Sequence, residues 1–183
     1  MFFGMKRVSS LLILLTILAS GIAVGQNLDE LRKNARLQAV NQQRSFVDFE
    51  LQTLRSGKTS LSEYEGEVVL LNFWATWCAP CRDEMPSMQT LYEALDDDEF
   101  EIVAVNVREQ PAPVEEFAKE YEITFPIFLD TSGRVSSTYG ARGLPVSYII
   151  GPDGTVVAGA LGGRDWTDSA IVEYFRALMG SKS

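Results

Sequence analysis

Two cysteines, Cys78 and Cys81, are separated by two residues and have the spacing needed for redox chemistry. An apolar run ends just before them and a helical pattern follows, so we expect Cys78 at the N-terminus of a helix. Unpaired backbone N–H groups and the positive end of the helix dipole favour the thiolate there. One helical turn brings the two sulfurs together. The spacing predicts thiol–disulfide exchange, in which Cys78 attacks a substrate disulfide and Cys81 displaces the product.

Other uses of the pair fit the sequence less well. A structural disulfide usually links distant segments, and a four-residue loop constrains the unfolded chain little. Zinc needs four ligands, but the chain has no third cysteine and no histidine. Haem attachment requires a histidine directly after the second cysteine, where Arg82 stands. We therefore expect no metal and no cofactor other than the redox-active disulfide itself.

Glu84 follows Cys81 by three residues and lies on the same face of the expected helix. The apolar stripe of that helix consists of Met85, Met88, Tyr92 and Leu95. A carboxyl group at the edge of this stripe would be partly desolvated, which raises its pKa towards that of a useful proton carrier. We interpret Glu84 as the group that moves protons for the thiols. The alternative is a side chain that reaches solvent at the rim of the stripe.

Alternating strands and helices must position these residues. Continuous apolar runs predict buried strands over 68–74 and 102–107. Shorter patterns predict further strands over 49–54, 125–129, 147–150 and 155–160. Helical spacing predicts helices over 79–95, 114–121 and 167–179. The natural packing of such a chain is an α/β sheet with helices on both faces.

The N-terminus has the pattern of an export signal. A basic pair, Lys6 and Arg7, precedes an apolar run and the small residues of Ala23-Val24-Gly25. We expect residues 1–25 to be a signal peptide; the alternative is an uncleaved membrane anchor, which is marginal against the roughly 20 residues of a membrane span. Residues 26–45 are predicted to form a polar, partly helical tether, and residues 46–183 the folded domain.

Composition excludes several classes of function. The chain has 25 acidic and 16 basic residues, a formal net charge of −9. Nucleic acid is a poor partner for such a chain, because neutralising phosphates requires a surplus of Lys and Arg. Histidine is absent, which removes histidine-based triads and imidazole metal sites.

The segment from Phe73 to Arg82, with Glu84 and Pro86, resembles the thioredoxin superfamily, and within it the exported TlpA/ResA-type thiol–disulfide oxidoreductases. The similarity covers about residues 46–178. It implies a thioredoxin-like central mixed sheet flanked by helices on both faces, with an N-terminal strand or hairpin addition. It also implies an insertion after the strand Val105-Asn106-Val107, from about Arg108 to Asp130.

The resemblance also implies roles for individual residues. Cys78 would be the exposed nucleophile and Cys81 the more buried resolving thiol. The substrate-binding residues would be Trp77, Pro80, Leu144 and Pro145. Pro145 would be a cis-proline packed beside the disulfide, and the backbone of Leu144 would pair with the substrate chain.

A second acid and a departure from the cytoplasmic thioredoxins bear on proton transfer. Glu109 matches an acidic position near the active-site cleft of relatives, where it would be a proton relay; the alternative is an exposed loop acid. Cytoplasmic thioredoxins bury an aspartate in the central strand, but this chain has Asn72, which cannot titrate. That departure strengthens the case for Glu84.

These features together predict an extracytoplasmic enzyme of a bacterium, in the periplasm or at the outer face of the cytoplasmic membrane. Its activity would be the reduction of disulfides in exported proteins, with cytochrome c maturation one setting and a membrane thiol donor as the source of electrons. We expect a monomer. The alternatives are an oxidase or isomerase of secreted proteins and a non-enzymatic copper or thiol carrier. A copper carrier is disfavoured because its extra ligands could only be Met85 and Met88, both on the core stripe.

Overall fold

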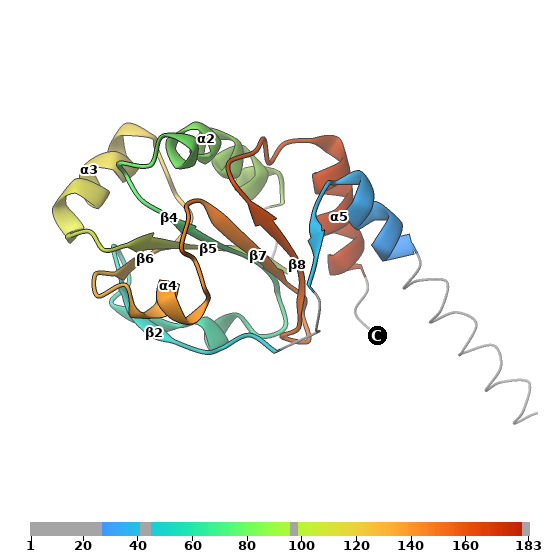
Figure 1. Cartoon of the computed structure of the whole chain (residues 1–183), viewed down its shortest axis with the longest axis horizontal. Helices are drawn as coiled ribbons and strands as arrows, with labels where there is room; N and C mark the ends of the chain where they lie inside the picture. Colours follow the sequence, from blue (N-terminus) through green and yellow to red (C-terminus); the bar gives the residue numbers. More distant parts are fainter. Residues whose placement is uncertain (1–26, 41–44, 96–98, 181–183) are drawn as a thin grey trace, which may run out of the picture.

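A mixed sheet of eight strands forms the centre of the protein, in the order β1-β8-β7-β4-β5-β6-β2-β3. The computed structural model describes residues 27–40, 45–95 and 99–180 (Figure 1). The central strand β4 (Val68–Trp74) is buried along its whole length. It pairs in parallel with β5 (Phe100–Val107) and antiparallel with β7 (Val146–Ile150). The continuous apolar run over 68–74 therefore forms a strand that is covered on both faces, which confirms the prediction.

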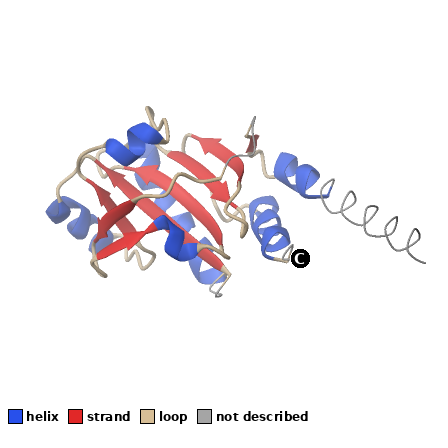
Figure 2. Cartoon of the chain, turned by 90° about the horizontal axis from the view of Figure 1, so that it is seen from below, coloured by secondary structure: helices blue, strands red, loops and turns tan. Residues whose placement is uncertain are grey.

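Helices cover both faces of this sheet, as expected (Figure 2). One face packs against α2 (Ala79–Ala94), α3 (Pro111–Glu120) and α5 (Ser169–Met179). The other face packs against the short helix α4 (Arg134–Thr138) and the 3₁₀ turn η1 (Leu61–Tyr64). Successive residues of β4 contribute to the two cores in turn, Leu70 to the first and Leu71 to the second.

The remaining strands agree with the expected additions to the sheet. An N-terminal hairpin of β2 (Glu50–Thr53) and β3 (Lys58–Ser60) extends one edge. The expected insertion contains α3 and ends in β6 (Ile127–Asp130), which lies parallel to β5. Near the other edge, β8 (Val156–Leu161) returns antiparallel to β7.

The segment 26–45 requires a correction. Its helical character is present over residues 27–34, and β1 (Gln38–Ala39) pairs with β8. Three of its apolar side chains are buried in the core of the domain: Leu31, Ala35 and Leu37. The helix lies beside α5 in both views (Figures 1 and 2). The described part of this segment is therefore integral to the fold and not a tether, and the folded domain begins well before Phe46.

The predicted signal peptide over residues 1–25 lies outside the described residues. Among the residues that the structure describes, no helix has both the length and the apolar character needed to cross a membrane.

Candidate active site

The two cysteines lie where the central strand passes into α2. Cys78 is the N-cap of the helix, and its sulfur accepts a hydrogen bond from the backbone N–H of Cys81 at 3.3 Å. The sulfurs are joined in a disulfide with 5.3 Å between the two Cα atoms. Cys78 is 6% exposed and Cys81 is fully buried. The geometry therefore makes Cys78 the sulfur that a partner can reach, in agreement with the expected order of attack.

A cis peptide bond joins Leu144 to Pro145, as the resemblance implied. Pro145 is buried and Leu144 is half-buried. The next residue, Val146, begins β7 and pairs with Phe73 near the end of β4 that leads to the cysteines. The expected cis-proline thus lies at the same end of the sheet as the disulfide.

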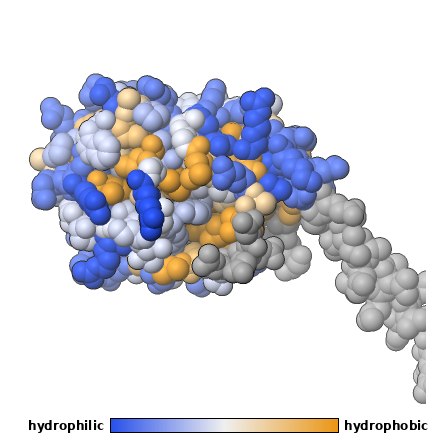
Figure 3. Space-filling model, viewed as in Figure 1, coloured by the Kyte–Doolittle hydropathy of each residue, from blue (hydrophilic) through white to orange (hydrophobic). Residues whose placement is uncertain are grey.

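Trp77 precedes the disulfide and is 69% exposed, an unusual environment for so large an apolar side chain. Leu161, at the end of β8, is 63% exposed and pairs with Val146. Apolar side chains also gather between hydrophilic ones on the face shown in Figure 3. The redox end of the sheet therefore offers apolar side chains to a docking polypeptide.

Glu84 is 1% exposed, so the alternative of a side chain that reaches solvent does not hold. Its carboxylate accepts hydrogen bonds from Asn72 Nδ2 at 2.9 Å, from Trp166 Nε1 at 3.1 Å and from the backbone N–H of Arg164 at 3.3 Å. Burial raises the pKa of Glu84 to about 7, although these hydrogen bonds act in the opposite direction. The carboxyl group can therefore exist in both protonation states near neutral pH.

The side-chain amide of Asn72 can form a hydrogen bond with either the ionised or the protonated carboxyl group of Glu84. Its Nδ2 donates to Glu84 and, at 3.0 Å, to the hydroxyl of Ser147, whereas its buried Oδ1 has no hydrogen-bond partner among the described residues. Rotation of the amide by half a turn would present Oδ1 to a protonated Glu84 and to the Ser147 hydroxyl, which can donate as well as accept. The central strand thus supplies a donor to the charged carboxylate and an acceptor for the neutral acid.

A loop that the sequence did not identify joins these parts. In residues 162–166, between β8 and α5, the Gly162 N–H donates to the carbonyl of Pro145 at 3.0 Å. Gly163 lies so close to the redox motif that an added Cβ would be 2.6 Å from the carbonyl oxygen of Pro80. Trp166 is fully buried, and its Nε1 donates a hydrogen bond to the carboxylate of Glu84. The signals in the sequence were the Gly-Gly pair and a tryptophan between an apolar strand and a helix.

Glu109 is half-buried and not the exposed loop acid of the alternative interpretation. Its carboxylate accepts hydrogen bonds from the backbone N–H of Thr76 at 2.8 Å, the hydroxyl of Thr76 at 2.5 Å and Asn106 Nδ2 at 2.7 Å. These contacts fix the loop that leads into Cys78. The proton-relay role of Glu109 stays a prediction, and its observed contacts are those of a residue that positions the loop.

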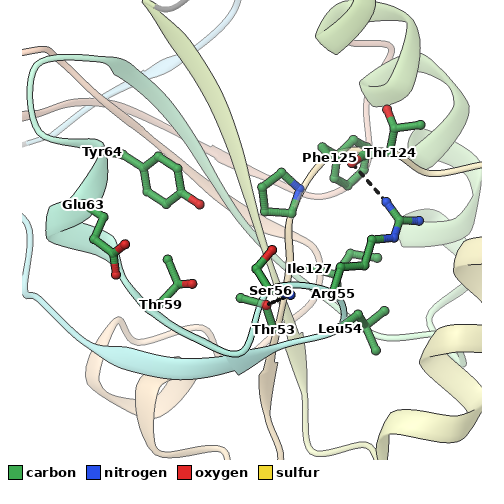
Figure 4. Close-up of a pocket in the computed structure, with 11 residues that line it drawn as sticks. Thr53, Leu54, Arg55, Ser56, Thr59, Glu63, Tyr64, Thr124, Phe125 and Ile127 are labelled. Atoms are coloured by element: carbon green, nitrogen blue, oxygen red, sulfur yellow. Dashed lines mark hydrogen bonds between the residues drawn. The ribbon is translucent and has the colours of Figure 1, made fainter.

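A pocket of about 700 Å³ opens beside the first turns of α2. Glu84 lines it together with Pro80 and Asp83 from α2, and Arg164 and Asp165 line it from the β8–α5 loop. A second pocket, of about 290 Å³, lies between the β2–β3 hairpin and residues 124–127 (Figure 4). There Arg55 donates to the backbone carbonyl of Thr124 at 3.1 Å. Two of the expected site residues, Pro80 and Glu84, line the first pocket, and none lines the second.

Comparison with known proteins agrees with this geometry. Residues 43–158 match the AhpC/TSA family. The chain is 38% identical over 131 residues to the thiol-disulfide oxidoreductase ResA of Bacillus subtilis (strain 168), which covers 72% of each chain. A solved structure of a thiol:disulfide interchange protein DsbE from Chlorobium tepidum aligns with a TM-score of 0.71 at 30% identity, covering 78% of this chain and all of that one. StoA from Bacillus subtilis aligns with a TM-score of 0.61 at 30% identity, covering 70% and 96%.

Proposed function

The chain belongs to the AhpC/TSA family, and from this premise we propose that it reduces disulfide bonds in exported proteins through Cys78 and Cys81. It is a thiol–disulfide oxidoreductase with a thioredoxin-like fold. The observation that carries the proposal is the disulfide at the N-terminus of α2, in which Cys78 is 6% exposed and Cys81 is fully buried. An exposed tryptophan and a cis-proline lie at the same end of the sheet.

The reaction transfers two electrons from the reduced pair to the substrate. The Cys78 thiolate attacks one sulfur of the substrate disulfide, so a bond forms between Cys78 and that sulfur while the second substrate sulfur leaves as a thiolate, which takes up a proton from solvent. The Cys81 thiolate then attacks the Cys78 sulfur. This step closes the bond between Cys78 and Cys81 and releases the remaining substrate thiol.

Glu84 is the proton acceptor in the second step. Cys81 must lose its proton before it attacks, and it is fully buried, so water cannot take that proton directly. Glu84 lies one helical turn further along α2, and its pKa of about 7 leaves about half of it ionised at neutral pH. A base whose pKa lies near the working pH is the most effective acceptor.

The positions of the remaining residues support the proposed substrate-binding roles. Trp77 offers an exposed ring beside Cys78, and Pro80 lies in the first turn of α2 between the two cysteines. Leu144 is half-buried ahead of Pro145, so its backbone can pair with an extended substrate segment. We propose that these four residues hold the substrate disulfide in line with Cys78.

The reductive direction is supported by the dipeptide between the cysteines. Strong stabilisation of the thiolate by a nearby cation is a property of an oxidant. Ala79 and Pro80 carry no charge, so they add no such cation. We further propose that a membrane thiol donor restores the reduced pair outside the cytoplasm, and that the enzyme acts as a monomer. Apocytochromes c are one class of exported substrate that such an enzyme would serve.

The reduction potential tests the direction. The protein is equilibrated with reduced and oxidised dithiothreitol at pH 7, and the oxidised fraction of the pair is measured by mass spectrometry after alkylation. A reductant would have a potential of about −270 mV, whereas a potential of about −120 mV would mark an oxidase of secreted proteins and overturn the proposed direction.

A further inference from the structure

Arg164 occupies an unusual position beside the redox pair. It belongs to the β8–α5 loop, and its backbone N–H donates to Glu84 at 3.3 Å. Its half-buried side chain extends over the ring of Trp166, with 5.4 Å between the guanidinium carbon and the ring centroid. The Nε atom is buried and has no hydrogen-bond partner among the described residues. A guanidinium partly removed from water with an unpaired N–H requires another source of stabilisation.

The charged groups around Glu84 and Arg164 identify what can stabilise the guanidinium. From α2, the carboxylate of Asp83 faces the same pocket, and from the loop Asp165 does. Asp165 is already engaged with the backbone N–H and the hydroxyl of Thr167. The strands contribute only the uncharged Asn72 and Ser147. Among the described residues that line the pocket, Arg164 is the sole cation.

Glu84 and Arg164 stabilise each other's charge. Burial lowers the pKa of the Arg164 guanidinium, and the neighbouring charge of Glu84 opposes that shift. In return, the positive charge of Arg164 acts against the burial that raises the pKa of Glu84, in addition to the larger opposing effects of the hydrogen bonds from Asn72, Trp166 and the Arg164 backbone. Because both groups are partly shielded from water, their attraction is stronger than that of an exposed pair.

We propose that Arg164 is a positioning residue for disulfide exchange, whose guanidinium supplies the counter-charge that allows Glu84 to ionise inside the protein. The Trp166 ring holds this guanidinium in place while its Nε1 donates to the same carboxylate. The inference rests on the proposed role of Glu84 as proton acceptor for Cys81. Without Arg164, less of Glu84 would be ionised at neutral pH, and Cys81 would lose its proton more slowly.

The test measures the titration of Glu84 directly. Carbon NMR of the side-chain carboxyl is followed against pH in the oxidised protein, with the resonance assigned by Glu84→Gln. Removal of a nearby opposite charge shifts a carboxyl pKa by about one unit or more. We expect Arg164→Gln to raise the Glu84 midpoint by about one pH unit and Arg164→Lys, which keeps the charge, to stay close to the wild type. Arg176→Gln, which removes an exposed cation on α5, is the matched control and should leave the midpoint unchanged.

The rate of product release gives the functional readout. A midpoint raised from about 7 to about 8 lowers the ionised fraction of Glu84 at pH 7 about five-fold. Release of substrate from the mixed disulfide with Arg164→Gln should therefore slow about five-fold at pH 7 and recover at about pH 9. Should Arg164→Gln fail to fold, Arg164→Met removes the same charge with an apolar chain of similar length.

The outcomes separate this inference from the proposed function. An unchanged Glu84 midpoint in a folded Arg164→Gln or Arg164→Met protein would overturn the role of Arg164, whatever the activity. A Glu84→Gln protein that releases substrate at the wild-type rate would instead overturn the proposed role of Glu84, and with it the link from Arg164 to exchange. A raised midpoint together with a release profile displaced to higher pH supports both.

Discussion

At the scale of single residues, the site depends on a carboxyl group that the fold has removed from water without neutralising it by a direct salt bridge. Glu84 receives three N–H donors, two of them from side chains of β4 and of the β8–α5 loop. The Oδ1 atom of Asn72 has no hydrogen-bond partner among the described residues, so it can accept a hydrogen bond from Glu84 when that carboxyl group is protonated. A buried group with two satisfied states is suited to repeated proton transfer.

The stability of the protein depends on pH through the titration of Glu84. The folded-state pKa of Glu84 is raised from 4.5 to about 7, so its contribution to stability is fully present below about pH 4.5 and is lost as the pH rises through 7. Glu101 has a pKa raised in the same direction by burial and is unchanged in the variant. We expect oxidised Glu84→Gln to lose less stability between pH 5 and pH 8 than the wild type does, by up to about 3 kcal/mol.

Urea unfolding at several pH values in that range measures this difference. Asp83→Asn, which removes an exposed carboxyl from the adjacent position of α2, is the matched control and should follow the wild-type curve. Parallel curves for Glu84→Gln and the wild type would show that folding does not raise the pKa of Glu84 above its unfolded-state value, and would contradict this prediction.

The residues of the site could be predicted from the sequence where their relation is local. Cys78, Cys81 and Glu84 lie on one short helical stretch, so their spacing alone places them together. Arg164 and Trp166 follow Glu84 by 80 and 82 positions and reach it only because β8 runs alongside β7. Such contacts have no local periodicity and could not be derived from the spacing of residue types.

At the scale of elements, the β8–α5 loop determines how the parts of the site fit together. The loop donates one backbone hydrogen bond to the carbonyl of Pro145 and another to the carboxylate of Glu84. Its Gly163 packs closely against Pro80. The absence of a side chain at Gly163 is what permits the contact with Pro80.

Gly163→Ala should therefore disturb the redox motif. The added methyl group would lie 2.6 Å from the carbonyl oxygen of Pro80, and this backbone atom cannot move without displacing the first turn of α2. We expect a loss of about 1–3 kcal/mol in the free energy of unfolding, as for other overpacked sites, together with slower disulfide exchange. Denaturant unfolding and a turnover assay measure the two effects.

Gly143→Ala provides the comparison for this experiment. A Cβ at Gly143 meets no atom within 4 Å, although the residue lies in the loop ahead of Leu144. Its stability should change by less than about 0.5 kcal/mol. Equal effects of the two substitutions would show that the contact between Gly163 and Pro80 has no special importance.

Elements with long or uninterrupted patterns were predicted closely, and short ones were missed. The strand over 68–74 has the predicted bounds, and α2 ends within a residue of its expected end. The helix α3 begins at Pro111, ahead of the expected start, because proline is compatible with the first turn of a helix. The helix α4 has five residues, too few to show a helical period.

At the scale of the whole molecule, the N-terminal segment completes the core on the side of α5. Leu31 and Leu37 are 9% and 4% exposed. Arg32 lies near enough to Tyr174 of α5 that its positive charge acts to lower the pKa of the tyrosine hydroxyl, against the effect of burial. The pattern of apolar residues in this segment would suit either a tether or a docked helix. The sequence could not distinguish the two because the receiving surface, on α5, comes more than 130 residues later.

Truncation tests this assignment. A chain that begins at Phe46 should be less stable than one that begins at Gln26 by several kcal/mol, since each buried leucine contributes about 1.5–3 kcal/mol. Leu37→Ala in the longer chain should cost about 2–4 kcal/mol. Denaturant unfolding measures both, and equal stability of the two chains would restore the interpretation of this segment as a tether.

The central claim, that Cys78 attacks and Cys81 resolves, is tested most directly by trapping. Cys78→Ser and Cys81→Ser each retain a single thiol, and each is mixed in reduced form with a protein that contains an accessible disulfide. Mixed-disulfide formation is then followed by mass spectrometry under non-reducing conditions. The account predicts rapid accumulation of the complex through Cys78 in Cys81→Ser and little in Cys78→Ser, whose remaining sulfur is buried. Equal rates in the two proteins, or no complex with either, would contradict it.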